Sequence, residues 1–224
     1  MSASEERQGW IAAVRSLAKD RDLVYEPVGG LNPRDAPPAL CPGGSNRLTG
    51  ELAEGFWGAS CDALERESGG LFRKSVLPGG VLVKSHMPDL ASVVPMFDVE
   101  SIEAGPDEQL KKRSARRVQF ESIEFNHRFL ATVPADHDPI ALRELFSPAF
   151  LTWVMTIDRE VDFGASDGQF FFMWHLRERS RDELELALKN ARRLFLSLKR
   201  ELEDANVATY PPGPWNAGIE SFPG

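Results

Sequence analysis

The chain has 224 residues and a formal net charge of −8 at pH 7, with 42% hydrophobic and 27% charged residues. These proportions are those of an ordinary globular protein and exclude both global disorder and a fibrous repeat. A chain of this length can bury about 70% of the surface that its unfolded form exposes, so it needs no disulfide or structural metal to stabilise its fold. The negative charge opposes non-specific binding to nucleic acid, because the overall field repels a polyanion.

Cysteine usage and the amino terminus predict a cytoplasmic protein. The two cysteines, Cys41 and Cys61, form no zinc-type Cys-x-x-Cys pair, so we expect no structural metal and no cofactor. We expect both thiols to stay reduced. The first residues are acidic, whereas a secretory signal carries basic residues before an apolar run. The longest mainly apolar run, Ser147 to Ile157, is about half of the roughly 20 residues that a membrane-spanning helix requires.

The first quarter of the sequence predicts a helix, a strand and a loop. Residues Ser4 to Asp20 form an amphipathic pattern, since apolar residues recur at three- and four-residue steps. Leu23 to Val28 is a short strand candidate. Gly29 to Ser45 is dominated by Gly and Pro, which predicts a long surface loop. Between Asn46 and about Glu67 we expect two strands.

The clearest hairpin of the first half pairs Leu71 to Leu77 with Val81 to His86. Its turn is Pro78-Gly79-Gly80, where glycine supplies the positive φ that a tight turn needs. The charged segment from Glu100 to Ser114 follows. We expect a single domain, with the alternative that two halves join near 100–115.

The second half opens with a segment, Arg117 to Val133, that we interpret as a strand with a bend near Ser122. Asp138-Pro139 then starts a short helix through Phe146, because Asp is a favoured N-cap and Pro is favoured at the first helical position. Ser147-Pro148 repeats this signal at once, and the helix that it opens should be largely buried.

A second hairpin is predicted from Val161 to Ala165 and from Gln169 to Leu176. Its turn is Ser166-Asp167-Gly168, and Asp-Gly between two apolar runs is a strong hairpin signal. Both faces of the second strand are apolar, so we expect that strand to be central.

The final helix is expected from Ser180 to about Ala205. Ser180 and Glu183 match the capping-box pattern, and an apolar stripe follows for six turns. Residues 206–224, rich in Pro and Gly, predict an irregular tail that Trp215 or Phe222 could anchor. The fold class predicted by these elements is α+β, in which an antiparallel sheet of hairpins is packed by the amino-terminal helix, two short central helices and the long carboxy-terminal helix.

Two motifs carry a family resemblance. Gln119 to Phe129 contains the pattern Glu-Ser-x-Glu-Phe-Asn-basic-basic-Phe, and Glu144 to Phe150 contains a Leu-Phe-Ser-Pro step. In these features the chain resembles a bacterial domain family of unknown function, over about residues 117–202 and more loosely over the hairpin around Leu71 to His86. Many members of that family look membrane-anchored, and this sequence has no such helix. The family has no assigned activity, so the resemblance implies no site residues.

Three motifs are candidate sites of chemistry. Gly164 to Gly168 matches Gly-x-Ser-x-Gly, but the nucleophile elbow needs a helix after Ser166 and a strand is predicted there. Glu124 and His127 match Glu-x-x-His, but a single pair is too few for a di-iron site, and in a strand the two side chains would point to opposite faces. Cys61 would need a base such as His86, and no sequence feature brings the two together.

Two further groups of side chains predict weaker binding sites. A basic run could contact phosphate or an anionic lipid, although a solvated linker is the favoured interpretation. An aromatic group could line an apolar pocket between the sheet and the last helix, although a packed core is favoured. The basic run is Lys111, Lys112, Arg113, Arg116 and Arg117, and the pocket candidates are Trp153, Phe170, Phe172, Trp174 and His175.

The leading functional hypothesis is a non-enzymatic cytoplasmic binding or assembly module. On this hypothesis the protein binds a protein partner or forms a homodimer. The apolar stripe of the last helix is one candidate surface for the homodimer. The first alternative is a carrier of a small apolar ligand in a cavity between sheet and last helix. The least favoured alternative is a hydrolase that uses Cys61 or Ser166.

Overall fold

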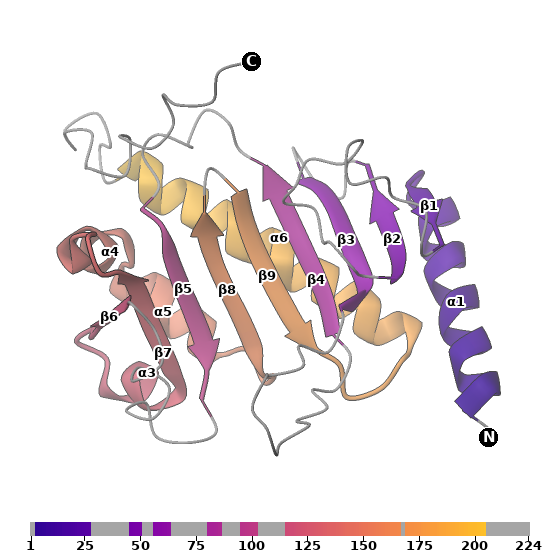
Figure 1. The fold of residues 1–224 in the computed structure, drawn as a ribbon, viewed down its shortest axis with the longest axis horizontal. Coiled ribbons are helices and arrows are strands. Elements are labelled where there is room, and N and C mark those ends of the chain that lie inside the picture. Colours follow the sequence, from indigo (N-terminus) through magenta and orange to yellow (C-terminus); the bar gives the residue numbers. More distant parts are fainter. Residues whose placement is uncertain are drawn as a thin grey trace. The chain divides into compact units, whose positions relative to one another are not determined.

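The computed structural model describes residues 3–27, 45–50, 56–63, 80–86, 95–102, 115–166 and 169–204. These residues form helices and antiparallel strands, so the protein is α+β, as its sequence predicts (Figure 1). The chain divides into two compact units, each built from two stretches of sequence: residues 1–86 with 171–192, and residues 87–170 with 193–224. The predicted junction near 100–115 falls mainly on residues outside the described part.

The first unit contains one long helix near the amino terminus, the first half of helix α6 (Arg181–Asp204) and an antiparallel sheet. Its elements confirm the predicted helix, the short strand after it and the two strands between Asn46 and Glu67. The strand order is β1-β2-β3-β4-β9. The elements are α1 (Ala3–Asp20), β1 (Val24–Glu26), β2 (Ser45–Thr49), β3 (Phe56–Ala63), β4 (Gly80–His86) and β9 (Gln169–His175), whose first two residues belong to the second unit.

Strand β4 is the second strand of the hairpin predicted in this region, but its neighbours are β3 and β9. The expected partner, Leu71 to Leu77, lies outside the described residues, as does the loop predicted from Gly29 to Ser45 except for Ser45 itself, which begins β2. At Gly80, an added Cβ would lie 2.8 Å from Met173 Sδ and 2.9 Å from the Trp174 carbonyl oxygen. Glycine at this position therefore allows β4 and β9 to approach closely.

Helix α1 lies alongside β1 and β2 (Figure 1). Trp10, Val14 and Leu17 are completely or almost completely buried, and they form the apolar face that the sequence pattern predicts. The far end of α1 is held by Arg181, which forms an ion pair of 2.7 Å with Asp20 and a hydrogen bond of 2.9 Å to Ser16. The pKa of the Arg181 guanidinium is raised, chiefly by its hydrogen bond of 2.8 Å to Glu185 and then by its contact with Asp20.

The second unit contains four strands in the order β8-β5-β7-β6, all antiparallel, together with three short helices and the second half of α6. Strand β6 is at the end of this order, and among the described residues it pairs only with β7. The elements are β5 (Phe97–Ser101), β6 (Ala115–Val118), α3 (Ile123–Arg128), β7 (Phe129–Pro134), α4 (Pro139–Leu145), α5 (Pro148–Met155) and β8 (Val161–Ser166).

The predicted bent strand from Arg117 to Val133 is wrong in its middle third, where the chain forms helix α3 between β6 and β7. Ser122 has extended backbone angles, and its hydroxyl accepts a hydrogen bond of 3.1 Å from Phe125 N. It is therefore an N-cap, and the predicted bend is a helix start. A six-residue helix is too short to be stable alone, so tertiary contacts must fix it.

The two other short helices begin where the sequence predicts. Asp138 caps α4 through a hydrogen bond of 2.9 Å from Ile140 N, and Ser147 caps α5 through one of 3.1 Å from Phe150 N. In both helices a proline occupies the first turn. Backbone N–H groups of the first turn have no acceptor inside the helix, so the missing N–H of proline costs no hydrogen bond there. Ser147 also donates a hydrogen bond of 2.7 Å to Glu201 Oε1, which joins α5 to the last helix.

Helix α6 (Arg181–Asp204) begins with the predicted cap, since Ser180 Oγ accepts a hydrogen bond from Glu183 N. The Glu183 carboxylate accepts a hydrogen bond of 3.0 Å from the Trp174 indole and is itself buried. The apolar stripe is buried within this chain, so it is not a free surface for a second copy. Its members with at most 2% exposure are Leu184, Ala187, Ala191, Leu194, Phe195, Leu198 and Leu202.

Candidate functional site

The residues of the family-like motif have structural roles in the second unit. Asn126 spans the turn before α3, because Phe120 N donates to its Oδ1 at 3.0 Å and its Nδ2 donates to Phe120 O at 2.7 Å. Arg117 on β6 donates to the Asn126 carbonyl oxygen at 3.1 Å. Phe125 and Phe129 are buried against each other, with ring centroids 4.9 Å apart. The motif therefore fixes the helix that interrupts the predicted strand.

Arg128, the second basic residue of the motif, holds the end of α5. Its guanidinium donates to the carbonyl oxygens of Met155 at 3.0 Å, Arg159 at 2.8 Å and Ile157. It also lies over the Phe129 ring, 5.1 Å from the centroid. Met155 is the last residue of α5, and the last carbonyls of a helix have no partner inside it. Arg128 therefore satisfies one carbonyl at the helix end and two in the segment that follows it.

Replacing Asn126 by Ala is expected to lower the free energy of unfolding by about 2 kcal/mol, because both hydrogen bonds to the Phe120 backbone are lost. Urea denaturation measures this change. Asn190→Ala is the matched control, since Asn190 makes one exposed bond to Leu186 O within α6, and we expect a change below about 0.5 kcal/mol. Equal losses in the two variants would contradict the bridging role of Asn126.

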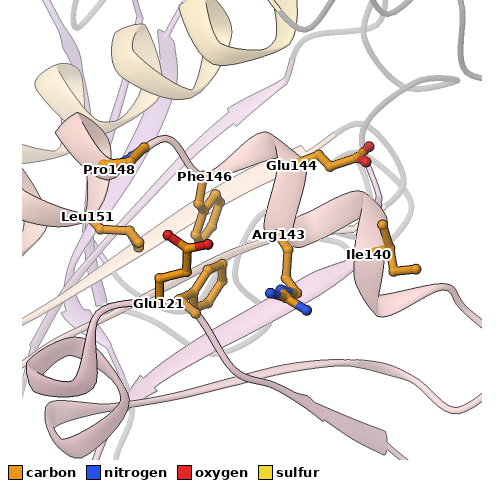
Figure 2. Close-up of a pocket in the computed structure, with 8 residues that line it drawn as sticks. Glu121, Ile140, Arg143, Glu144, Phe146, Pro148 and Leu151 are labelled. Carbon is orange, nitrogen blue, oxygen red and sulfur yellow. The ribbon is translucent and has the colours of Figure 1, made fainter.

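A pocket of about 380 Å³ lies beside α4, and we call it the α4 pocket. Its floor contains Phe120 and Phe146, whose rings stack with centroids 5.3 Å apart and planes within 12°. Figure 2 shows that α4 contributes Ile140, Arg143 and Glu144, while Glu121 approaches from the turn before α3. Pro148 and Leu151 of α5 complete the wall.

The α4 pocket combines an apolar floor with a charged, exposed rim. Phe120 and Phe146 are 7% and 3% exposed, whereas Ile140 on the rim is 54% exposed. The three charged rim residues are all exposed, and two are acidic and one is basic. A lining that combines an exposed isoleucine with two buried aromatic rings favours an apolar ligand group, and the volume is near the lower limit for ligand pockets.

The aromatic residues predicted to line a pocket do not contribute to the α4 pocket. Phe170, Phe172 and Trp174 are at most 1% exposed; the Phe172 and Trp174 rings lie 6.1 Å apart, and the Phe170 ring is 6.1 Å from that of Phe195. Trp153 is half-buried under the Arg193 guanidinium, 4.8 Å from the ring centroid. His175, also half-buried, ends β9.

The two hydrolase candidates lie on strands. Ser166 is the last residue of β8, and strand β9 follows it, so the strand-to-helix turn of a nucleophile elbow is not formed. Cys61 lies on β3 within a register irregularity after Ser60, which pairs with Leu82. His86 is at the far end of β4, about 16 Å along the sheet from the part of β4 that faces Cys61.

Glu124 and His127 lie on α3, which corrects the prediction that a strand would turn them to opposite faces. A three-residue step on a helix places them on one face, where both are exposed. In the part of the chain that the structure describes, no group of three or more His, Cys, Asp or Glu side chains could hold a metal ion. A single pair is insufficient for the predicted di-iron pattern.

Two other charged groups lie outside these candidates. The basic run is described only at Arg116, which is exposed, and Arg117, which is bonded to Asn126 O. In the turn before α4, His137 Nδ1 lies 3.1 Å from Asp136 Oδ1, and the hydrogen bond from this ring lowers the pKa of the Asp136 carboxyl. The Asp136 side chain is exposed, so we attribute its lowered pKa to a local contact within the turn.

No family model, curated protein or solved structure matches this chain. The resemblance to a family of unknown function therefore stays a prediction from its motif residues. Among the described helices, none is both long and apolar enough to cross a membrane. The α4 pocket could not be found from sequence, because its two aromatic residues are 26 positions apart and meet only through the fold.

Proposed function

We propose that the protein is a non-enzymatic binding module whose binding surface is the α4 pocket. The observation that carries this proposal is a pocket that the stacked pair Phe120 and Phe146 lines together with the exposed Ile140 side chain. An apolar floor with a polar rim is the usual anatomy of a recognition site. Its size suits one or two inserted side chains of a peptide, and we take an apolar or aromatic peptide segment as the ligand class.

The motif geometry supports the same proposal. Phe120 is held by Asn126, and Phe146 lies between the caps of α4 and α5, so rigid local structure positions both floor residues. A preformed site loses less conformational entropy when a ligand binds. The motif thus supports binding indirectly, by building the floor of the pocket.

The carrier and hydrolase alternatives have less support. The aromatic residues proposed for a carrier cavity are packed against ring neighbours, and a small apolar ligand in the α4 pocket is the remaining form of that hypothesis. A strand rather than a helix follows Ser166, and among the described residues His86 lies about 16 Å along the sheet from the part of β4 that faces Cys61. We further propose a cytoplasmic location, and self-assembly would require a surface other than the buried stripe of α6.

Fluorescence anisotropy with labelled decapeptides tests the binding proposal. One set of peptides places an aromatic residue beside proline, and a control set replaces each aromatic residue by glycine. The full chain is expected to bind the aromatic set, and Ile140→Asp to weaken binding at least about tenfold by placing a charge in the lining of the pocket.

Val24→Asp is the matched control for this experiment, because Val24 is 59% exposed and lies on β1 of the first unit. It should leave peptide binding unchanged. Equal loss in both variants, or equal binding of the aromatic and glycine sets, would contradict recognition by the α4 pocket.

A further inference from the structure

Two of the three charged residues that line the α4 pocket have no partner among the described residues. Neither Glu121 nor Arg143 forms a hydrogen bond, an ion pair or a ring contact within this part of the chain. Glu144, in contrast, already has an interaction partner, and Figure 2 shows that its carboxylate extends away from Glu121 and Arg143. The pocket therefore offers a ligand one carboxylate and one guanidinium.

The two available charges come from different elements of the second unit. Arg143 lies on α4 three residues after Ile140, so the two side chains project from the same side of the helix. Glu121 directly follows Phe120, whose ring forms part of the apolar floor. Each charge thus stands beside an apolar residue of the pocket, and a matching ligand combines charge with an apolar side chain.

The last residue of a peptide has this combination of groups. Its α-carbon carries a carboxylate, an N–H group and a side chain, whereas the backbone of an interior segment carries no charge for Arg143. A guanidinium can bind a carboxylate through two parallel hydrogen bonds, and the Glu121 carboxylate can accept a hydrogen bond from the N–H group. A basic ligand would pair with Glu121, but Arg143 would repel it.

We propose that the α4 pocket binds the carboxy-terminal residue of a partner peptide and that Arg143 recognises the terminal carboxylate. This inference rests on the proposed function, because it names the part of a peptide that occupies the same pocket. The last side chain is aromatic or large and aliphatic, to match the apolar lining. Arg143 is exposed, so solvent weakens its ion pair. The apolar lining therefore supplies most of the affinity, and Arg143 supplies specificity for a chain end.

Two labelled decapeptides test this proposal by fluorescence anisotropy. Both end in phenylalanine, and they differ only in having a free terminal carboxylate or a terminal amide. The free-acid peptide is expected to bind the unsubstituted chain about fivefold more tightly, the effect of one exposed ion pair. In Arg143→Gln the two peptides should bind equally. A preference for the free acid that persists in Arg143→Gln, or no preference in the unsubstituted chain, would overturn the proposal.

Arg192→Gln is the matched control for this measurement. Arg192 is also exposed, and its loss removes the same charge from the chain without changing the pocket lining. This variant should keep the fivefold preference for the free acid. Circular dichroism should show that both variants are folded, because each replaces an exposed side chain. An equal loss of preference in Arg192→Gln and Arg143→Gln would show that overall charge, rather than the pocket, selects the free acid.

The two proposals can fail separately. If the free-acid and amide peptides bind equally well, and glycine in place of the last phenylalanine weakens both, the binding function holds and recognition of the carboxylate is wrong. If no peptide binds, the proposed function fails, and this inference fails with it. Free phenylalanine that competes as strongly as the free-acid decapeptide would identify a free amino acid as the ligand, which would overturn the peptide end as the partner.

Discussion

Phe146→Ala is expected to lower the free energy of unfolding by about 4 kcal/mol, because the site has little room to relax after the ring is removed. The Phe146 ring is 3% exposed, and its centroid lies 4.7 Å from that of Phe150 and 5.3 Å from those of Phe97 and Phe120. Its loss leaves a cavity among these aromatic rings. Equilibrium unfolding in urea, followed by circular dichroism, gives the change.

Two further variants separate packing from simple proximity to the pocket. Phe146→Leu keeps most of the apolar volume and should cost about 1 to 2 kcal/mol. Ile140→Ala removes an exposed side chain from the same pocket and should cost less than about 1 kcal/mol. A loss below about 1.5 kcal/mol for Phe146→Ala would show that the ring is not a packing centre of the second unit.

Arg128→Ala should lower the free energy of unfolding by about 3 kcal/mol, since three carbonyl oxygens lose a charged donor. Arg128→Lys keeps the charge but has no planar fork that can reach several carbonyls at once. We therefore expect lysine to recover less than half of the loss. Thermal and urea unfolding of the three proteins provide the comparison.

Arg192→Ala is the matched control for Arg128, because Arg192 is exposed on the middle turns of α6. Its change should lie within about 0.5 kcal/mol. If Arg128→Lys were as stable as the unsubstituted chain, a positive charge near the end of α5 would be enough to stabilise this region. The planar shape of the guanidinium group would then make no contribution to stability.

Local signals in the sequence predict most of the helix starts. Asp138-Pro139, Ser147-Pro148 and Ser180 each place a capping side chain directly before a helix, and the structure confirms all three. These predictions succeed because a cap acts on residues two or three positions away. The α+β class follows from the same local patterns and is confirmed.

Helix α3 was missed because its stabilising contacts are not local. Arg117 comes from the strand before it, and Asn126 reaches back to Phe120 across the turn. One signal was present, since Phe125 and Phe129 are four residues apart, as on one face of a helix. The strand-like run of apolar residues around them outweighed that spacing.

The α4 pocket is a tertiary feature, and its residues carry no joint pattern in the sequence. Phe120 lies before α3 and Phe146 lies between α4 and α5, so only the folded second unit places one ring on the other. The sequence offered an aromatic group, Trp153 with residues of β9, as a pocket candidate, although a packed core was the favoured interpretation. Phe170, Phe172 and Trp174 of that group are buried, and aromatic content alone does not separate a packed core from a pocket lining.

The division of the chain into two interleaved units constrains the order in which they can fold during synthesis. Residues 1–86 leave the ribosome first, but their unit also needs residues 171–192, which supply most of β9 and the first half of α6. Those residues appear only after residues 87–170 of the other unit have been made. Domains usually fold as units from the amino terminus onward. Here the edge of β4 that pairs with β9 stays unpaired until residues 171–192 have been made. An unpaired strand edge can pair with other chains, so we expect a chaperone to be most useful during this part of synthesis.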